Sequence, residues 1–244
     1  MLPHSHRTRI ARFMRHCMYE HDTDERTGGV LLAVNIFDRY MDYLRKKNNP
    51  LFRANPGAML RAVIGACLLI ASKYHHTDAF KVRELACVVS LGPLSSKSAI
   101  AMENAIRRAE QSVLSCIGFG VGTPLADTVL CARFGPLKDV VGSHTFSMSD
   151  LVYPRTLIEI FSSGDAYLDH SPDELAAAAV YLAKMTDPTT TTNPVGDMSE
   201  LAARIWAAWL DEPVGDRELG LAVPLADPVQ FNVPCTRTTS VVGC

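Results

Sequence analysis

Histidines and glycines are the residues of this sequence whose spacing most readily suggests chemistry. His75 and His76 are adjacent, and four more histidines lie near the N-terminus, but none has the spacing of a metal site with a cysteine or carboxylate on one helix. The segment GFGVG at 118–122 has the glycines of a phosphate loop without a preceding strand. No Ser/His/Asp or Cys/His arrangement suggests a nucleophile. We therefore expect no catalytic site, no metal and no cofactor, and expect the histidine pair to cap the end of a helix.

Cysteine usage indicates the cellular compartment, and net charge and hydropathy indicate which classes of partner to expect. The seven cysteines are odd in number, lie mostly in apolar runs and form no CxxC pair, a pattern typical of reduced thiols in a nuclear or cytoplasmic protein. The formal net charge of −2 gives no footprint for nucleic acid. The longest apolar stretch is interrupted by Arg61 and is shorter than the roughly 20 residues that span a bilayer. Neither nucleic acid nor membrane is an expected partner.

The elements that must position any functional residue are predicted to be helices throughout the first half. In GGVLLAVNIFDRYMDYL, apolar residues recur at helical spacing and the charged ones take other faces. Residues 58–73 are apolar almost all round, which indicates a hub helix surrounded by others. Two further helices are expected from a cap at Asp78 and from a cap at Ser95 or Ser96. With a first helix near residues 6–20, about five helices precede Gly122.

A second helical group is predicted after the linker GFGVGTPLAD. One helix is expected to begin near Pro154, and SPDE at 171–174 is a capping box with proline at the first helical position. Trp206 and Trp209 lie three apart on an apolar helix and are predicted to be core residues. After Asp211 prolines and glycines multiply, which indicates a poorly ordered tail. The predicted fold class is therefore all-α, in two groups of about five helices.

Three segments in order carry a resemblance to a known family. LAVNIFDRYM, GACLLIASKY and RAEQSVLSCIGF followed by TPLADTVL resemble the signature segments of the cyclin box, and LIEIFSSGDAYLDHSPDELAAAAVYLA resembles the second cyclin fold. The resemblance implies two tandem five-helix cyclin folds. We expect the kinase-binding box at 1–121, the C-terminal cyclin fold at 122–212 and the tail at 213–244.

The resemblance also implies a non-catalytic partner of a cyclin-dependent kinase, which it would bind and activate by a shift of population toward the active kinase. The family's kinase-binding pair is a lysine that ends the third helix and a glutamate in the fifth. Lys73 in ASKY matches the lysine. Counting back from LSCIGF makes Glu110 the preferred glutamate, while Glu103 in AMEN is the alternative, seven residues away and on nearly the same helix face.

A structural ion pair of the family has candidates here as well. The arginine of the first helix would be Arg7, with Arg9 as the alternative, and the aspartate of the DR segment would be Asp38. Removing one member of such a buried pair would cost about 3–5 kcal/mol, because the other charge stays buried alone.

The sequence departs from the family pattern at the patch that recruits substrates. Phe13 stands where the first helix usually has a tryptophan, and Arg61 stands where the patch often has a glutamine; with Ile10 they form a remnant of the patch. Most cell-cycle cyclins follow the lysine with acidic residues where His75 and His76 stand. On this reading the chain is expected to have no long region before the box. It is therefore expected to be closer to D-type or virus-encoded cyclins.

Two alternative functions are considered in addition to the leading hypothesis, which is a kinase-activating cyclin that promotes cell-cycle progression. A cyclin-fold transcription factor that binds promoter DNA also carries tandem boxes, although the balanced charge argues against it. A kinase-binding adaptor without activation is suggested by His75 and His76. Kinase substrates or inhibitors are further possible partners, and the expected location is the nucleus, the cytoplasm or both.

Overall fold

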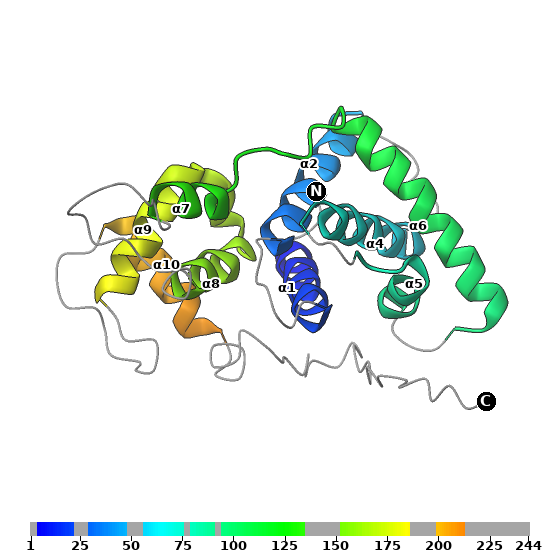
Figure 1. Ribbon diagram of the computed structural model, residues 1–244, viewed down its shortest axis with the longest axis horizontal. Coiled ribbons are helices and arrows are strands. Elements are labelled where there is room, and N and C mark those ends of the chain that lie inside the picture. The colour runs from blue at the N-terminus through cyan, green and yellow to red at the C-terminus, as the bar shows by residue number, and fades with distance from the viewer. Residues whose placement is uncertain are drawn as a thin grey trace.

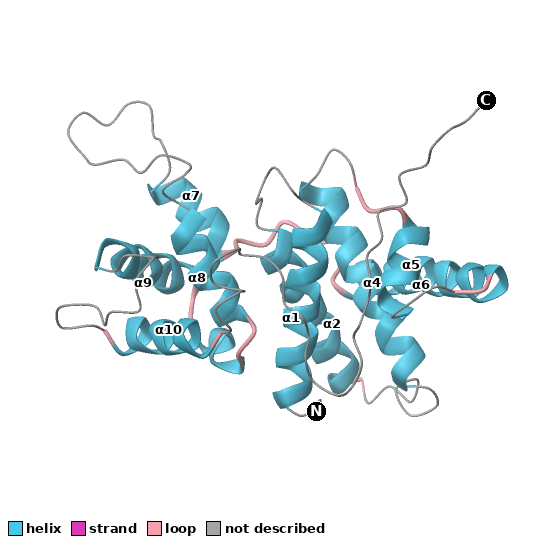
Figure 2. Cartoon of the chain, turned by 90° about the horizontal axis from the view of Figure 1, so that it is seen from below, coloured by secondary structure: helices cyan, strands magenta, loops and turns pink. Residues whose placement is uncertain are grey.

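The computed structural model describes the chain in seven segments, which together contain nine α-helices, one 3-10 helix and no strand (Figures 1 and 2). The helices form two groups, and the protein is therefore all-α in the part described, as the sequence predicted. The segments are 4–21, 29–47, 56–75, 79–90, 94–134, 152–185 and 199–212. Asp78, His76 and the tail at 213–244 lie outside them.

The first group contains the five helices expected before Gly122, with ends that differ by a few residues. Helix α4 contacts each of the other four, and most of its middle is fully buried, so it is the hub that its apolar sequence predicted. Ser95 caps α6 by accepting a hydrogen bond from Ser98 N. The five are α1 (His4–His21), α2 (Gly29–Lys46), α4 (Pro56–His75), α5 (Val82–Ser90) and α6 (Ser96–Cys116).

Helix α5 begins later than the expected cap at Asp78. Its first helical hydrogen bond runs from Leu85 N to Lys81 O, so the helix begins at Val82. The preceding backbone is held elsewhere, because Phe80 N donates to Ser72 Oγ at the end of α4. The expected cap, Asp78, is therefore four residues before the start of α5 and not at its cap position.

The second group contains four α-helices and the 3-10 helix η1 in the described residues. The capping box at the start of α9 is present: Ser171 N donates to Glu174 Oε2 at 2.8 Å, and Glu174 N donates to Ser171 Oγ at 3.3 Å. Trp206 and Trp209 are buried as predicted. The elements are α7 (Ala126–Phe134), α8 (Val152–Ser162), η1 (Asp165–Asp169), α9 (Pro172–Met185) and α10 (Glu200–Asp211).

The two groups meet where α8 and η1 lie against α1, and α8 also contacts α2 (Figure 1). Helix α6 lies at the opposite side of the first group, and residues 117–125 lead from its end back to α7. Pro154 lies in the first turn of α8, where its missing N–H leaves no helical hydrogen bond unmade. The first group therefore has one face joined to the second group and another face, around α6, turned away from it.

Candidate functional site

Lys73 and Glu110 form an ion pair between the end of α4 and the second half of α6. Lys73 Nζ lies 2.6 Å from Glu110 Oε1, although the residues are 37 positions apart in the sequence. The lysine side chain is 52% exposed and the glutamate side chain 15% exposed. The pair thus has a partly covered acceptor and an accessible ammonium group, which can donate further hydrogen bonds to a partner.

A close helix contact sets the distance between these two side chains. A Cβ atom on Gly65 of α4 would lie 3.0 Å from Ile106 Cδ1 and 3.1 Å from Ile106 Cγ1 of α6. Glycine therefore allows α4 and α6 to approach more closely than a larger residue would. Lys73 follows Gly65 by about two turns and Glu110 follows Ile106 by about one turn. The contact in the core consequently fixes where the two charged groups meet.

Hydrogen bonds hold the backbone on both sides of the pair, and those of Ser72 are buried while that of Arg39 is exposed. Ser72, fully buried beside Lys73, donates to Leu69 O at 2.9 Å and accepts from Phe80 N at 3.3 Å. Arg39 of α2 donates to Gly120 O at 2.7 Å in the turn that follows α6. The Lys73–Glu110 pair therefore stands on elements that are already positioned in the free chain.

The other residues predicted near this pair lie around it without joining it. Glu103 lies two turns before Glu110 on α6, is partly buried, and forms no ion pair with any residue that the structure describes. His75 is partly buried and packs edge to face on Tyr74, with ring centroids 5.3 Å apart. Of the two glutamates considered, the structure brings Glu110 to Lys73. His76 lies outside the described residues.

Arg7 and Asp38 form a second ion pair, in the interior. Arg7 Nε donates to Asp38 Oδ1 at 2.9 Å and Arg7 Nη2 donates to Asp38 Oδ2 at 2.7 Å, the bidentate geometry of an arginine and a carboxylate. Burial raises the pKa of Asp38 above its ordinary value, and the hydrogen bonds and charge of Arg7 oppose that rise. Arg9, the alternative, is partly exposed and has no ion pair in the described segments.

Arg7 also contacts the second group of helices directly. Its Nη1 atom donates to three successive carbonyl oxygens that follow or end α8: Ser162 O at 3.1 Å, Ser163 O at 3.2 Å and Gly164 O at 2.9 Å. These carbonyl groups lack a partner farther along their own helix, because α8 ends here. One arginine of α1 thus holds a carboxylate of its own group and the end of a helix from the other.

The residues of the predicted substrate patch take different positions. Ile10 and Phe13 lie in the core, 9% and 6% exposed, while Arg61 is exposed on α4. The apolar members of the remnant therefore offer little surface to a substrate.

Sequence reasoning missed a set of buried polar contacts between α1 and the second group. Tyr19 donates a hydrogen bond to Glu159 of α8, and Arg15 and Arg12 both donate to the carboxylate of Glu212, whose side chain is 2% exposed. Burial raises the pKa of Glu159 to about 7, against the opposing effect of the Tyr19 hydrogen bond. The signal was present in LIEIF, where a carboxylate interrupts an apolar run.

Two other kinds of site were sought among the described residues. None of their helices is both long enough and apolar enough to cross a membrane. In the same residues, no group of three or more His, Cys, Asp or Glu side chains is placed so that it could hold a metal ion.

Residues 1–122, half of the chain, match the family model for the N-terminal domain of cyclins. The matched range covers α1 to α6 and contains both members of the Lys73–Glu110 pair. A search of the curated proteins gave no match.

Proposed function

The chain belongs to the cyclin family, and from that premise we propose that it is a regulatory subunit that binds and activates a cyclin-dependent kinase and so promotes cell-cycle progression. Cyclins are regulators without catalytic activity of their own, and their domains generally bind such kinases. The observation that carries the proposal is the contact of Lys73 with Glu110 on two fixed helices. They are the residues that the resemblance to the family assigns to kinase binding.

The proposed mechanism uses the charge pair as a preformed docking point. The ammonium group of Lys73 has three donors and uses one on Glu110, which leaves the others for backbone carbonyl groups beside the kinase helix. The carboxylate of Glu110 accepts hydrogen bonds from polar groups of the same kinase segment. Binding stabilises the active arrangement of that helix, so the kinase population shifts toward it. The residues that bind ATP and magnesium belong to the kinase.

The second group of helices completes the proposal as a second five-helix cyclin fold, so that the chain holds two folds in tandem at 1–121 and 122–212. The packing of α7, α8, α9 and α10 on one another supports a separate helical unit. The five cysteines described are all free thiols, in keeping with a proposed location in the nucleus or the cytoplasm. The assignment to D-type or virus-encoded cyclins stays a prediction.

Kinase binding and activation test the proposal. The protein is mixed with candidate cyclin-dependent kinases, and the dissociation constant and the phosphorylation of histone or a retinoblastoma peptide are measured. We expect Lys73→Ala and Glu110→Ala to weaken binding at least tenfold each. Asp42→Ala with Lys46→Ala is the matched control, because Lys46 Nζ and Asp42 Oδ2 are also 2.6 Å apart and exposed, on α2.

Each outcome has a definite meaning. Binding that depends on Lys73 and Glu110 and is followed by phosphorylation supports a kinase-activating cyclin. Binding without phosphorylation would identify an adaptor that has lost activation. Failure to bind any candidate kinase, or binding that is unchanged when both residues are replaced, contradicts the proposed docking mechanism.

A further inference from the structure

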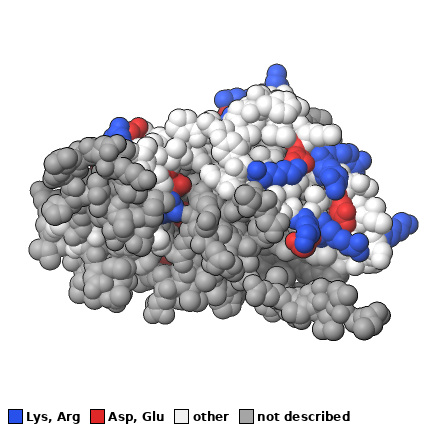
Figure 3. All heavy atoms as spheres, in the orientation of Figure 1, with Lys and Arg blue, Asp and Glu red and all other residues white. Residues whose placement is uncertain are grey.

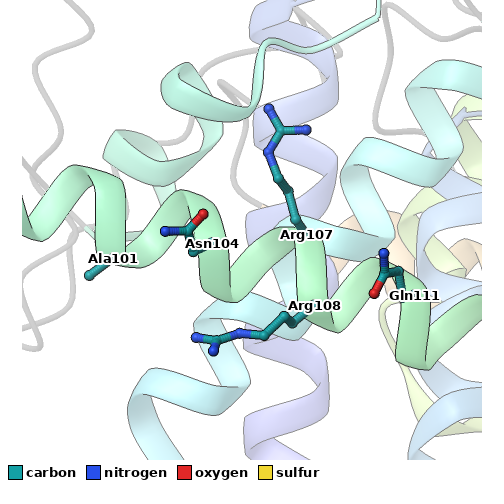
Figure 4. Close-up of a pocket in the computed structure, with 5 residues that line it drawn as sticks. All are labelled: Ala101, Asn104, Arg107, Arg108 and Gln111. Atoms are coloured by element: carbon teal, nitrogen blue, oxygen red, sulfur yellow. The ribbon is translucent and has the colours of Figure 1, made fainter.

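A shallow hollow, open to solvent, lies among exposed side chains on the outward face of α6 (Figure 4). All its lining residues come from this one helix, and Arg107 and Arg108 extend from the ribbon in different directions. The lining residues are Ala101, Asn104, Arg107, Arg108 and Gln111.

The lining offers hydrogen-bond donors and positive charge with no acidic side chain among its members. Two guanidinium groups and two carboxamide groups surround the hollow. Both arginines are exposed, and neither forms an ion pair with a residue in the part of the chain that is described. Arg45 and Arg133 are also exposed, but each has an aspartate partner. The charge of Arg107 and Arg108 is therefore available to an acidic group from outside the chain.

Arg107 is the lining residue of the hollow that lies nearest to Glu110 around α6. Arg107 precedes Glu110 by three residues, which places it about 60° around the helix from the glutamate. Gln111 and Asn104 follow farther round, on the side opposite the buried residues Ile106 and Val113. Arg108 lies about 160° around α6 from Glu110. A partner that reaches Lys73 and Glu110 from outside would thus have Arg107 beside it and would meet Arg108 only where it extends across the outer face of α6.

The net charge of −2 conceals a strong asymmetry between the two halves. Residues 1–122 contain 17 Lys and Arg against 10 Asp and Glu, whereas residues 123–244 contain 7 against 16. Figure 3 shows Lys and Arg side chains gathered over the region of α5 and α6. The first half therefore attracts acidic surfaces over a distance, an effect that salt weakens.

We propose that this hollow binds an acidic group, a carboxylate or a phosphate, on the kinase that docks at Lys73 and Glu110. The inference rests on the proposed function. It adds that the kinase segment in contact with α6 carries an acidic group. Arginine forks suit carboxylate and phosphate oxygens equally, so both sources share one chemistry. A nucleic acid is a weaker fit, because Glu103 and Glu110 lie along the same helix and would repel its phosphate groups.

The test compares two variants with the same change of net charge. Arg107→Glu with Arg108→Glu changes the hollow, while Arg83→Glu with Lys97→Glu changes exposed residues of α5 and of the first turn of α6. Kinase association and dissociation rates are measured at low and high salt. We expect the first variant to raise the dissociation constant at least tenfold, mainly through faster dissociation, and the second to slow association only a few-fold. Arg107→Lys with Arg108→Lys, which keeps the charge and loses the fork, should fall between them.

Parallel measurements separate this inference from the proposed function. If Lys73→Ala with Glu110→Ala abolishes binding while the two charge-reversed variants behave alike, the docking site stands and the hollow has no specific role. A chain that binds no kinase overturns both, and salt-dependent binding of a DNA duplex that is lost in Arg107→Glu with Arg108→Glu would assign the hollow to nucleic acid instead. Phosphatase treatment of the kinase identifies the source: a loss of affinity indicates phosphate, and no change indicates carboxylate.

Discussion

The pair Lys73–Glu110 and the pair Arg7–Asp38 join similar groups in different surroundings. In the first, the lysine side chain is 52% exposed and touches one carboxylate oxygen. In the second, both side chains are mostly covered, at 10% and 16% exposure, and the arginine also donates to carbonyl groups of the other helical group. One pair faces the solvent on the α6 side, and the other lies at the joint between the groups.

The difference in burial between the two pairs predicts different roles for them: the exposed pair in binding and the buried pair in folding stability. An exposed ion pair contributes little to folding because water screens it and the side chains lose entropy. Removal of one member of a buried pair is costly because the remaining charge has neither water nor partner. The joint between the groups also includes Tyr19 with Glu159 and Arg15 with Glu212. We therefore expect substitutions at the joint to change the free energy of unfolding, and substitutions at Lys73 to change the affinity for a partner.

The largest expected effect is that of Arg7→Ala. The substitution leaves Asp38 buried without its counter-ion and removes the donor to Ser162 O, Ser163 O and Gly164 O, so the free energy of unfolding should fall by about 3–5 kcal/mol. Urea unfolding measures it. Arg9→Ala, two residues away on α1, is the control and should change stability by less than about 0.5 kcal/mol.

Replacement of both Arg7 and Asp38 tests how much of the stability loss in Arg7→Ala comes from the Asp38 carboxylate that is left without a counter-ion. Arg7→Met with Asp38→Leu should recover part of the stability lost in Arg7→Ala, because Asp38 no longer leaves a buried charge without its counter-ion. It should not recover all of it, because the carbonyl groups after α8 still lack the donor. Full recovery would mean that Arg7 does not hold the second group of helices.

The contrast between these contacts shows what the sequence could predict. The resemblance proposed Arg7 with Asp38 because both lie in short recognisable segments of one fold. The contact of Arg7 with Gly164 joins residues 157 positions apart and depends on how the two groups dock. No local pattern encodes that docking, since a backbone carbonyl group has the same chemistry at every residue.

The second effect is a pH dependence at Glu159. Its pKa in the folded protein is about 7, above the ordinary 4.5, because burial disfavours the charged form. The folded state therefore keeps a proton that the unfolded chain releases between these values, so the stability that this proton provides is lost as the pH rises from about 4.5 to about 7. In Glu159→Gln the loss should vanish. The difference in unfolding free energy between the two proteins should change by roughly 2–3 kcal/mol between pH 5 and pH 8.

A matched substitution keeps the test specific to the buried group. Glu174→Gln changes an exposed carboxylate of the capping box. It should leave unchanged the fall in unfolding free energy between pH 5 and pH 8. If Glu159→Gln has the same profile as the unsubstituted protein, Glu159 titrates at its ordinary pKa and the joint is open to water. The carboxylate in LIEIF could have been recognised as a buried charge from the sequence, but its partner Tyr19 lies 140 positions away.

The third effect links the core to the exposed pair. Gly65→Val would place side-chain carbon within about 3 Å of Ile106, and we expect α6 to shift away from α4 to relieve this contact, at a cost of about 1–3 kcal/mol. The same shift should separate Lys73 from Glu110 and weaken kinase binding by more than the stability change alone explains. Gly57→Ala is the control, because a Cβ atom there meets nothing within 4 Å. Unchanged kinase affinity in Gly65→Val would show that the docking point does not depend on this helix contact.

The sequence placed Gly65 in the hub helix but could not say which helix approaches it. A glycine in an apolar run has no side chain to indicate a neighbour, and Ile106 on α6 is one of many apolar residues. The position of Glu110 could be predicted more readily, because it was counted from the family segment LSCIGF. Its partial burial and its contact with Lys73 depend on the approach of α4 to α6 at Gly65.

The smallest expected effect on folding is that of Lys73→Ala. The lysine is half exposed and Glu110 keeps access to water, so the free energy of unfolding should change by less than about 1 kcal/mol, and less still at high salt. Kinase affinity should nevertheless fall at least tenfold in the same variant. Urea unfolding and kinase binding, measured on one preparation, check both statements. A stability loss as large as that of Arg7→Ala would make Lys73–Glu110 a structural pair like Arg7–Asp38, and the contrast between the two pairs would then be wrong.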